Sequence, residues 1–372
     1  MNVPFLDLKM QYNSIRDEIN PAIQNILDSC SYILGNSVSD FEQEFAKLHN
    51  GKYCYGLASG TAGNHVVLWT LGVGPGDEVI IPANTFIATA WGATLCGAQP
   101  VFVDCHPDSY NIDPDKVENA ISSRTKAIVA VHLYGQAADM DALEDIAQRH
   151  NIHLVEDCAQ AHISEYKGKK IGSLSIASSF SFYPGKNLGA YGEGGAVMTN
   201  DNNIAKKLKC IRAHGAEEKY THTIFGHNYR MDGIQGAVLK VKLKHLQSWT
   251  EKRRKAAAKY KELLFEIKEV QTPVEMPYNK HVYHLFVIQT PKRDLLQAYL
   301  NENKISTGIH YPIPLHLQPC FNHLGYRKGD FPISEKLADN CISLPLFPEI
   351  TEEQIQYVCS TISEFFKRQF YN

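Results

Sequence analysis

The chain has 372 residues, 44% of them hydrophobic and 21% charged, a composition typical of a globular protein with room for one large domain and a smaller one. Its formal net charge of −3 gives no electrostatic reason to expect nucleic acid or a membrane surface as a partner. The nine cysteines form no CxxC pair, and no apolar run approaches the roughly eighteen residues that span a bilayer. We therefore expect no structural metal and no membrane partner.

The amino-terminal segment, residues 1–19, mixes polar and apolar side chains and lacks the cationic start and apolar block of a signal peptide. Cysteines that are scattered singly along a chain are typical of reduced thiols in the cytosol. Both features favour a cytoplasmic location.

Short apolar runs alternate with amphipathic stretches from residue 51 to about residue 200. The expected strands are 78–83, 100–104, 126–135, 152–158, 178–184 and 195–200. Helical patterns follow Thr61 and cover 87–96 and 140–150. This alternation predicts an α/β fold, with βαβ units around a mostly parallel sheet whose two faces are covered by helices.

A helical pattern then continues from about residue 233 to residue 267 and connects to a smaller domain with a strand at 281–290 and helices at 293–303 and 352–366. We therefore expect a large domain over 1–250, with the amino-terminal segment, and a small carboxy-terminal domain over 251–372. The basic run Lys252 to Lys255 lies on the connecting helix, where we expect a solvated face rather than a nucleic-acid site.

A single lysine stands in unusual backbone in the stretch SFSFYPGKNLGAYGEGG, residues 179–195. Strand-forming residues end at Pro184-Gly185, Lys186 follows, and further glycines come after it. These glycines can mark turns with no functional role, so this stretch alone fits a structural turn and a functional lysine equally well.

Two other segments bear on this lysine. VEDCAQAH, residues 155–162, lies at the carboxyl end of an apolar strand, where open α/β sheets bind ligands. Either Glu156 or Asp157 can face a ligand there, because alternation points only one of them inward, and an Asp can also simply cap the following turn. ASGTAG, residues 58–63, opens a helix whose free backbone N–H groups can bind an anion, although Ser and Thr are also ordinary helix caps.

A lysine, a strand-end carboxylate and a hydroxyl-rich helix start in one α/β domain suggest pyridoxal 5′-phosphate (PLP) as cofactor. In that arrangement the lysine bonds to the cofactor, the acid pairs with its ring nitrogen and the helix start receives its phosphate.

The order of ASGTA, ANTFIATA (83–90), VEDCAQAH, SFSFYPGKNLGAYGEGG and GHNYRMDGIQGAVL resembles the DegT/DnrJ/EryC1/StrS family of sugar aminotransferases. The resemblance runs from PFLDLKMQY (4–12) to GIHYPIPLHLQ (308–318). It implies the fold of PLP-dependent aspartate aminotransferases (fold type I). Within the family, YPGKNLGA is most similar to the enzymes that aminate carbon 3 of dTDP-3-oxo-6-deoxyhexoses, with L-glutamate as the implied amino donor.

The resemblance implies a role for each matching residue around the cofactor. Lys186 matches the Schiff-base lysine, and Asp157, rather than Glu156, matches the partner of the pyridine nitrogen. Gln160 matches the side chain near the ring hydroxyl, and Phe86 matches the aromatic residue that stacks on the ring. The matches to phosphate contacts are Gly60, Thr61 and Ser181.

The resemblance also implies a homodimer with shared active sites, since Asn228 matches an asparagine that reaches the phosphate of the neighbouring subunit. Four more residues lie where the family binds the sugar nucleotide or lines the cleft, and a purely structural role suits them equally well: Tyr183, His310, Tyr311 and His316. Departures from the family pattern at Ile163, Ile176 and Glu193 concern the substrate more than the reaction.

Several alternatives remain at this point. The related dehydratases carry histidine in place of the lysine, so Lys186 argues against that reaction. Amination at carbon 4, or of a UDP-linked sugar, fits the same motifs. A regulatory protein that keeps only the fold is disfavoured by the intact lysine and aspartate, and a nicotinamide enzyme is disfavoured because no GxGxxG follows an early strand.

Overall fold

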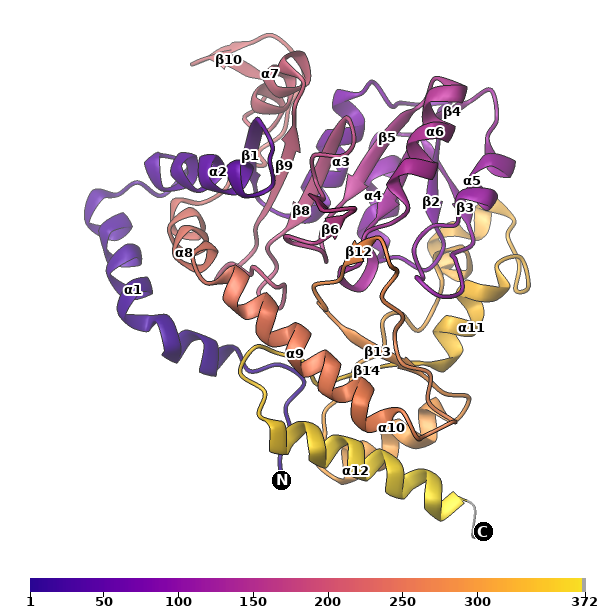
Figure 1. Ribbon diagram of the computed structural model, residues 1–372. Helices are drawn as coiled ribbons and strands as arrows, with labels where there is room; N and C mark the ends of the chain where they lie inside the picture. Colours follow the sequence, from indigo (N-terminus) through magenta and orange to yellow (C-terminus); the bar gives the residue numbers. More distant parts are fainter. Residues whose placement is uncertain (370–372) are drawn as a thin grey trace.

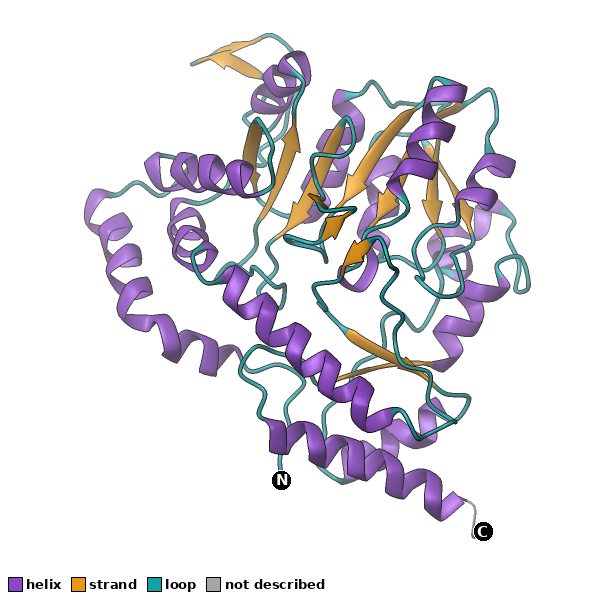
Figure 2. Cartoon of the chain, in the orientation of Figure 1, coloured by secondary structure: helices purple, strands orange, loops and turns teal. Residues whose placement is uncertain are grey.

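A seven-stranded sheet forms the centre of the computed structural model, which describes residues 1–369 (Figures 1 and 2). The strand order is β1-β9-β8-β5-β4-β2-β3. Its strands are β1 Tyr53–Leu57, β2 Glu78–Pro82, β3 Gln99–Val103, β4 Thr125–Val131, β5 His153–Asp157, β8 Ala177–Ser181 and β9 Gly195–Thr199. Only β9 runs against its neighbours, so the sheet is mixed and mostly parallel.

Helices cover both faces of this sheet, which explains why a strand such as β2 is buried at every residue. One hydrophobic core packs the sheet against α2, α5 and α6, and a second core packs it against α3, α4 and α7. These helices are α2 Asn36–Leu48, α3 Gly60–Thr70, α4 Ile87–Leu95, α5 Pro114–Ala120, α6 Met140–His150 and α7 Asn202–Ile211.

All six strands that the sequence predicts between residues 78 and 200 are present, with small shifts at their ends. The predicted strand 126–135 is shorter, because the chain leaves the sheet after Val131 and forms the 3₁₀ helix η1 Leu133–Gly135. Strand β1 was not predicted; it is an edge strand of five residues that pairs with β9, and its Leu57 also forms a bridge with Arg230.

The helical pattern after residue 233 forms two helices rather than one. α8 Gly233–Leu243 ends, and α9 Leu246–Leu264 begins in a new direction after Lys244 and His245 (Figure 1). Neither residue is a glycine or a proline, so local propensity carried no signal for the break.

The sequence suggested that the basic run on α9 is a solvated face, but the structure shows that one of its four side chains is buried. Lys252 and Lys255 are exposed, whereas Arg253 is buried on the inner side of the helix and donates from Nη1 to the carbonyl oxygen of Leu346 at 2.9 Å. A run of four basic residues on a helix can therefore include one side chain, here Arg253, that is buried.

The carboxy-terminal part has its own hydrophobic core, to which α9, α10, α12 and the pair β13–β14 contribute. The predicted strand 281–290 is limited to β13, because Tyr283 has a positive φ of 44° and turns the chain before it. These elements are β13 Phe286–Gln289, α10 Arg293–Glu302, α11 Pro332–Asn340, β14 Cys341–Leu344 and α12 Glu352–Gln369.

Short elements complete the fold outside the central sheet. The remaining strands are β6 Glu165–Tyr166, β7 Lys169–Lys170, β10 Ala216–Glu218, β11 Thr221–His222 and β12 Asn279–Lys280, and the remaining 3₁₀ helices are η2 Leu315–Leu317 and η3 Pro319–Leu324. β10 and β11 form a hairpin that projects from the molecule beyond α7 (Figure 1).

The first residues of the chain contribute to the carboxy-terminal core. Val3 is fully buried in that core and forms a bridge with Ile305. The chain then passes the central cavity at Phe5 and Leu6 and enters α1 Leu8–Ser29, which packs against α8. The amino terminus consequently lies beside α12 (Figure 1).

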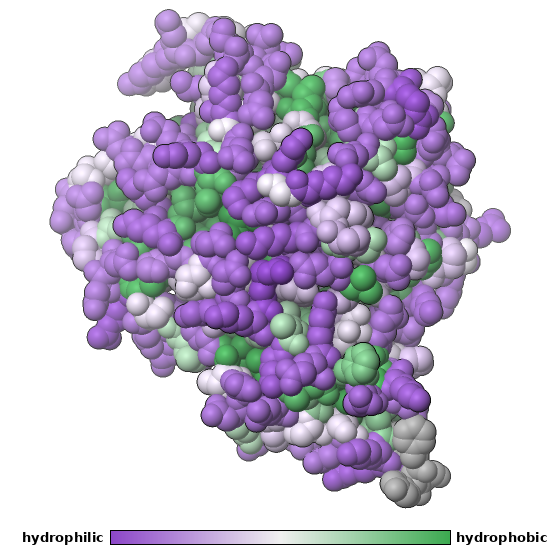
Figure 3. Space-filling view, in the orientation of Figure 1, coloured by the Kyte–Doolittle hydropathy of each residue, from purple (hydrophilic) through white to green (hydrophobic). Residues whose placement is uncertain are grey.

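Across residues 1–369, no helix is both long enough and apolar enough to cross a membrane. The face shown in Figure 3 is largely hydrophilic, and hydrophobic side chains gather on it over α8, in the hollow below α2.

Candidate active site

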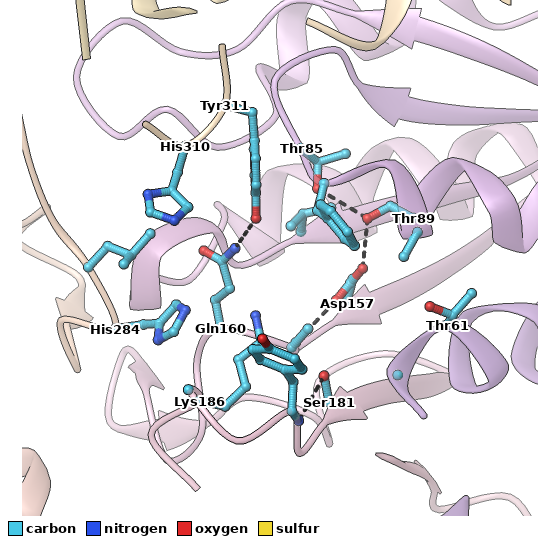
Figure 4. Close-up of a pocket in the computed structure, with 18 of the residues that line it drawn as sticks. Thr61, Thr85, Thr89, Asp157, Gln160, Ser181, Lys186, His284, His310 and Tyr311 are labelled. Carbon is cyan, nitrogen blue, oxygen red and sulfur yellow. Dashed lines mark hydrogen bonds between the residues drawn. The ribbon is translucent and has the colours of Figure 1, made fainter. Parts of the chain in front are cut away.

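A cavity of about 690 Å³ opens at the carboxyl ends of β4, β5 and β8. Residues at the ends of the central strands and at the start of α3 line one end of it, and residues next to β13 and β14, together with Phe5 and Leu6, line the other. Asp157 and Lys186 mark the first end in Figure 4, and His284 and His310 mark the second. Ten of the twelve residues that the sequence singles out line this cavity: Gly60, Thr61, Phe86, Asp157, Gln160, Ser181, Tyr183, Lys186, His310 and Tyr311.

The start of α3 forms the anion-binding corner of the cavity. Ser59 caps the helix, with its Oγ accepting from the N–H of Ala62 at 3.1 Å, so the helix begins where Gly60 and Thr61 line the cavity. Gly60 lies so close to Ser181 that an added Cβ would come within 2.6 Å of the serine Cβ. The start of α3 and the hydroxyl-bearing residues Thr61 and Ser181 therefore line one corner of the cavity, which suits a phosphate group.

Lys186 follows the turn at the end of β8, where its N–H donates to the carbonyl oxygen of Tyr183 at 2.8 Å. Gly189 allows this turn, since a Cβ there would lie 2.2 Å from the carbonyl oxygen of Pro184. The side chain is partly accessible from the cavity, and desolvation lowers the pKa of its ammonium to about 8, with Asp157 acting in the opposite direction. A substantial fraction of Lys186 is therefore an uncharged amine near neutral pH.

The two neighbouring carboxylates at the end of β5 face opposite sides of the sheet. Asp157 lies on the side of α3 and α4, where it is buried and lines the cavity. Its Oδ2 accepts from Asn64 Nδ2 at 2.9 Å and from Thr89 Oγ1 at 2.8 Å, while Oδ1 accepts from the N–H of Ala159 at 3.1 Å.

Glu156 lies on the other side and serves the fold. Its two oxygens accept from the N–H groups of Gly172, Leu174 and Ser175, at 2.6 to 3.0 Å, which anchors the loop before β8. His132 Nε2 lies 3.1 Å away, and these hydrogen bonds outweigh desolvation and lower the pKa of Glu156.

His132, Glu156 and Cys158 bring three potential metal-ligand atoms within 4.8 Å of one another. His132 Nδ1 accepts from the N–H of Ala138 at 3.1 Å, so Nε2 carries the proton and faces the carboxylate as a donor. Hydrogen bonding within the fold therefore explains the approach of His132 to Glu156.

Aromatic and amide groups form the wall between the two ends of the cavity. Gln160 Oε1 accepts from the N–H of Tyr134 at 2.7 Å, which turns its Nε2 toward the hydroxyl of Tyr311 at 3.0 Å (Figure 4). The ring centroids of Phe86 and Tyr311 are 5.5 Å apart. Phe86 lines the cavity and is 51% exposed. Its free face can stack on a planar ligand.

The end of the cavity toward the carboxy-terminal part holds two histidines, His284 and His310. Asn187 donates through Nδ2 to the carbonyl oxygen of Val282 at 3.1 Å, so its Oδ1 faces His284 Nδ1, 3.3 Å away, and requires a proton there. Nε2 of His284 is then the unprotonated nitrogen. Burial lowers the pKa of His284 well below its usual value and that of His310 to about 4, so both are neutral.

Some residues of this end could not be found from the sequence pattern. His284 lies in an ordinary apolar strand pattern, and Phe5 and Leu6 are far away in sequence from the other lining residues. Phe5 stacks on His310 with ring centroids 5.9 Å apart. Asn64 and Thr89 were also missed, although each lies inside a quoted motif or immediately after one.

Two predicted residues lie outside this cavity. His316 is buried, with Nε2 3.0 Å from Glu335 Oε1 and its ring packed against Phe331. Its position within this chain is that of a structural side chain. Asn228 follows the β10–β11 hairpin, where its Oδ1 accepts from Arg230 Nε at 3.1 Å.

The residues present fit the expected cofactor. The α3 corner suits a phosphate, Asp157 suits a protonated ring nitrogen, Phe86 suits an aromatic ring, and the Lys186 amine is available for a covalent bond.

Comparison with known proteins agrees with this arrangement. The sequence profile of the DegT/DnrJ/EryC1/StrS aminotransferase family matches residues 13–363. The chain belongs to this family. The expected family and the expected α/β fold with a mostly parallel mixed sheet are thus confirmed.

Individual relatives cover almost the whole chain. A pleiotropic regulatory protein of Geobacillus stearothermophilus is 49% identical over 369 residues, which are 99% of each chain. A dTDP-3-amino-3,4,6-trideoxy-alpha-D-glucose transaminase of Streptomyces venezuelae is 43% identical over 366 residues, 98% of this chain and 97% of the relative. The crystal structure of S. venezuelae DesV in complex with a ketimine intermediate has a TM-score of 0.96, 43% identity and 98% coverage of both chains.

Proposed function

We propose that this aminotransferase uses PLP to transfer an amino group from L-glutamate to carbon 3 of a dTDP-linked 3-oxo-6-deoxyhexose. The observation that carries the proposal is a partly accessible lysine with a lowered pKa, which lines the same cavity as a buried aspartate and a helix amino terminus. Family membership and the transaminase relative at 43% identity support the reaction and the sugar class.

PLP, when bound, supplies an electron sink for the charge left on a substrate carbon that loses its proton. Asp157 would hold the proton on the ring nitrogen, and a charge-assisted hydrogen bond of this kind contributes about 1.5–3 kcal/mol. Gly60, Thr61 and Ser181 would bind the phosphate, and Phe86 would cover the ring.

Lys186 would move the protons of the reaction through its Nζ. With a pKa of about 8, roughly a tenth of this amine is uncharged at pH 7, against a few parts in ten thousand at the ordinary pKa of about 10.5. The amine would take a proton from the α carbon of glutamate and later deliver one to carbon 3 of the sugar.

The histidine end would bind the hexose. His284 offers an unprotonated Nε2 as acceptor for a sugar hydroxyl, and the hydroxyl of Tyr183, on a side chain that is 55% exposed, can bind a second polar group. His310 and Tyr311 complete this end. His316, away from the cavity, would contribute only by supporting the segment that carries them.

The proposal includes a homodimer with shared active sites. Tyr220 and Phe225, in and after the projecting hairpin, are 84% and 86% exposed, which is unusual for large aromatic side chains without a partner. Asn228 follows them and would reach the phosphate site of the neighbouring subunit.

Mixing two inactive variants tests the shared site. With Lys186→Ala and Asn228→Ala subunits dissociated and reassociated in equal amounts, random pairing gives about a quarter of the wild-type sites. Activity near that level supports sharing, and a mixture as inactive as its components would contradict it.

We place the enzyme in the cytoplasm. All nine cysteines are free thiols, and six of them are buried away from any cysteine partner, as expected where thiols stay reduced.

A regulatory role is the second candidate, because the relative at 49% identity carries the name of a regulatory protein. The visible absorption spectrum of the protein distinguishes the two candidates. An enzyme loaded with PLP changes its visible absorption band when glutamate is added, whereas a protein that only retains the fold leaves the band unchanged.

Locating the amine on the product tests the proposed reaction. The purified protein is incubated with PLP, L-glutamate and the gluco or galacto isomer of dTDP-3-oxo-6-deoxyhexose, and the product is examined by NMR. We expect an amine at carbon 3 from one isomer and no product with Lys186→Ala. An amine at carbon 4, or turnover only of a UDP-linked sugar, would refute the substrate assignment and leave the reaction class in place.

A further inference from the structure

The carboxylate of Asp157 is held by two side chains from different helices, Asn64 of α3 and Thr89 of α4. Both donate to the same oxygen, Oδ2, at 2.9 and 2.8 Å, and both donors are at most 5% exposed. The other oxygen, Oδ1, accepts only the N–H of Ala159, at 3.1 Å, among the described residues.

The amide of Asn64 can point in only one way. Ser179 Oγ on β8 donates to Asn64 Oδ1, which fixes the amide oxygen on that side. The amide nitrogen is consequently turned to Asp157, with the carbonyl oxygen of Ala88 as a weaker second acceptor at 3.5 Å.

Thr89 is oriented in the same manner. Its single hydroxyl proton goes to the carboxylate, which can only accept, so the neighbouring hydroxyl of Thr85 must donate to Thr89 Oγ1 across 3.1 Å (Figure 4). Two series of hydrogen bonds therefore end on Oδ2 of Asp157. One runs from Ser179 through Asn64, and the other runs from Thr85 through Thr89.

We propose that Asn64 and Thr89 are positioning residues that occupy Oδ2 of Asp157 and thereby reserve Oδ1 for the ring nitrogen of the cofactor. A carboxylate oxygen has two acceptor positions, so Oδ2 is filled and Oδ1 keeps one. Asn64 and Thr89 also prevent rotation of the carboxylate about χ2 of Asp157, a torsion angle that is otherwise broadly distributed.

The effect of Asn64 and Thr89 on the cofactor does not depend on which sugar is the substrate. If the two side chains were merely satisfied polar groups of a tightly packed interior, their loss would lower the stability of the protein and leave the bound cofactor unaffected.

The test compares Thr89→Val with Thr89→Ser and Thr94→Val. The first change removes the hydroxyl at nearly constant volume, the second keeps it, and the third makes the same substitution on the same helix, where Thr94 Oγ1 only meets the carbonyl oxygen of Trp91 at 3.4 Å. The measurements are the dissociation constant for PLP, the pH midpoint of the visible band of the loaded enzyme, and the thermal stability of the protein without PLP.

We expect Thr89→Val to weaken PLP binding about tenfold, since a hydrogen bond to a charged group is lost. The pH midpoint should rise by about half a unit, because a ring proton that is held less firmly leaves less positive charge near the Lys186 nitrogen. Thr89→Ser should stay close to the wild type, and Thr94→Val should be unchanged in both measurements.

Equal dissociation constants and equal pH midpoints for Thr89→Val and the wild type would overturn the proposal, whatever happens to stability. If Thr89→Val does not fold, Thr85→Val provides the decisive variant, since it removes only the donor that orients Thr89. A smaller shift in the same direction supports the proposal, and no shift contradicts it.

Discussion

The two ends of the cavity are built in different ways. At the cofactor end, Asp157, Ser181 and the start of α3 are held by the central sheet and by directed hydrogen bonds between buried groups. At the histidine end, segments distant in sequence meet, and Tyr183 remains about half exposed. This contrast suggests that the chemistry is fixed by a rigid frame, while the substrate is recognised by surfaces that differ easily between relatives.

The largest expected effect is at the cofactor end. Lys186→Ala should reduce turnover on the order of 10⁴-fold or more, because both the covalent attachment and the proton transfer depend on one Nζ. Steady-state rates with glutamate and the keto sugar give the measurement, and circular dichroism verifies the fold. Lys244→Ala, at an exposed lysine in the turn after α8, is the matched control and should keep full activity. Residual activity of more than a few per cent in Lys186→Ala would contradict the assigned role.

The adjacent carboxylates of β5 should separate function from stability. Asp157→Asn should fold normally and lose about 10²–10³-fold in turnover, because an amide cannot stabilise a protonated ring nitrogen as a carboxylate does. Glu156→Gln should lower the free energy of unfolding by about 3 kcal/mol, since an amide replaces an acceptor of several N–H groups in a buried site.

Denaturant unfolding and turnover are measured for both variants. The interpretation fails if Glu156→Gln is as stable as the wild type or if Asp157→Asn unfolds the protein.

Desolvation of the Lys186 ammonium should make the cofactor-free wild type less stable at neutral pH than a variant with an uncharged side chain at this position. The pKa of this lysine is about 8 in the folded chain and about 10.5 in the unfolded chain. The free-energy cost of burying its charge is therefore complete below pH 8, decreases as the pH rises, and is absent above pH 10.5. Lys186→Met should therefore raise the free energy of unfolding at pH 7, by up to about 3 kcal/mol.

At pH 9.5 this gain should be less than half as large, because most folded chains then carry the neutral amine while most unfolded chains are still charged. Urea unfolding of both PLP-free proteins at the two pH values measures it. A gain that is independent of pH would point to better packing rather than to removal of a buried charge.

The smallest expected effect is at the histidine end. Tyr183→Phe should lower kcat/KM for the keto sugar about fivefold to tenfold, the size of one neutral hydrogen bond, and leave kcat/KM for glutamate nearly unchanged. Tyr53→Phe on the edge strand β1, where the hydroxyl bonds Asn202 at 2.9 Å, is the control. Equal losses for both substrates would show that Tyr183 acts on the shared chemistry instead of on the sugar.

The cofactor end could be predicted from sequence because its residues lie in short motifs at strand ends and at one helix start. Asp157 was separated from Glu156 by resemblance, and the structure adds the physical reason, which is the alternation of side chains along β5. Asn64 and Thr89 were missed because a polar residue in an apolar helix gives no indication of what it faces.

The histidine end could be predicted only in part. His310 and Tyr311 lie in a recognisable segment, but His284 and Phe5 reach the cavity through long-range packing, and no local pattern encodes that. The break between α8 and α9 has the same origin, since tertiary packing redirects a chain whose local propensity favours one continuous helix.

Identification of the residue that bonds the cofactor tests the central claim most directly. The protein is loaded with PLP, reduced with borohydride and digested, and the peptides are analysed by mass spectrometry. We predict that the reduced cofactor is found on the peptide that contains Lys186, and that adding glutamate before the borohydride prevents the labelling. Labelling of another lysine, or no labelling of Lys186 at full cofactor occupancy, would contradict the account.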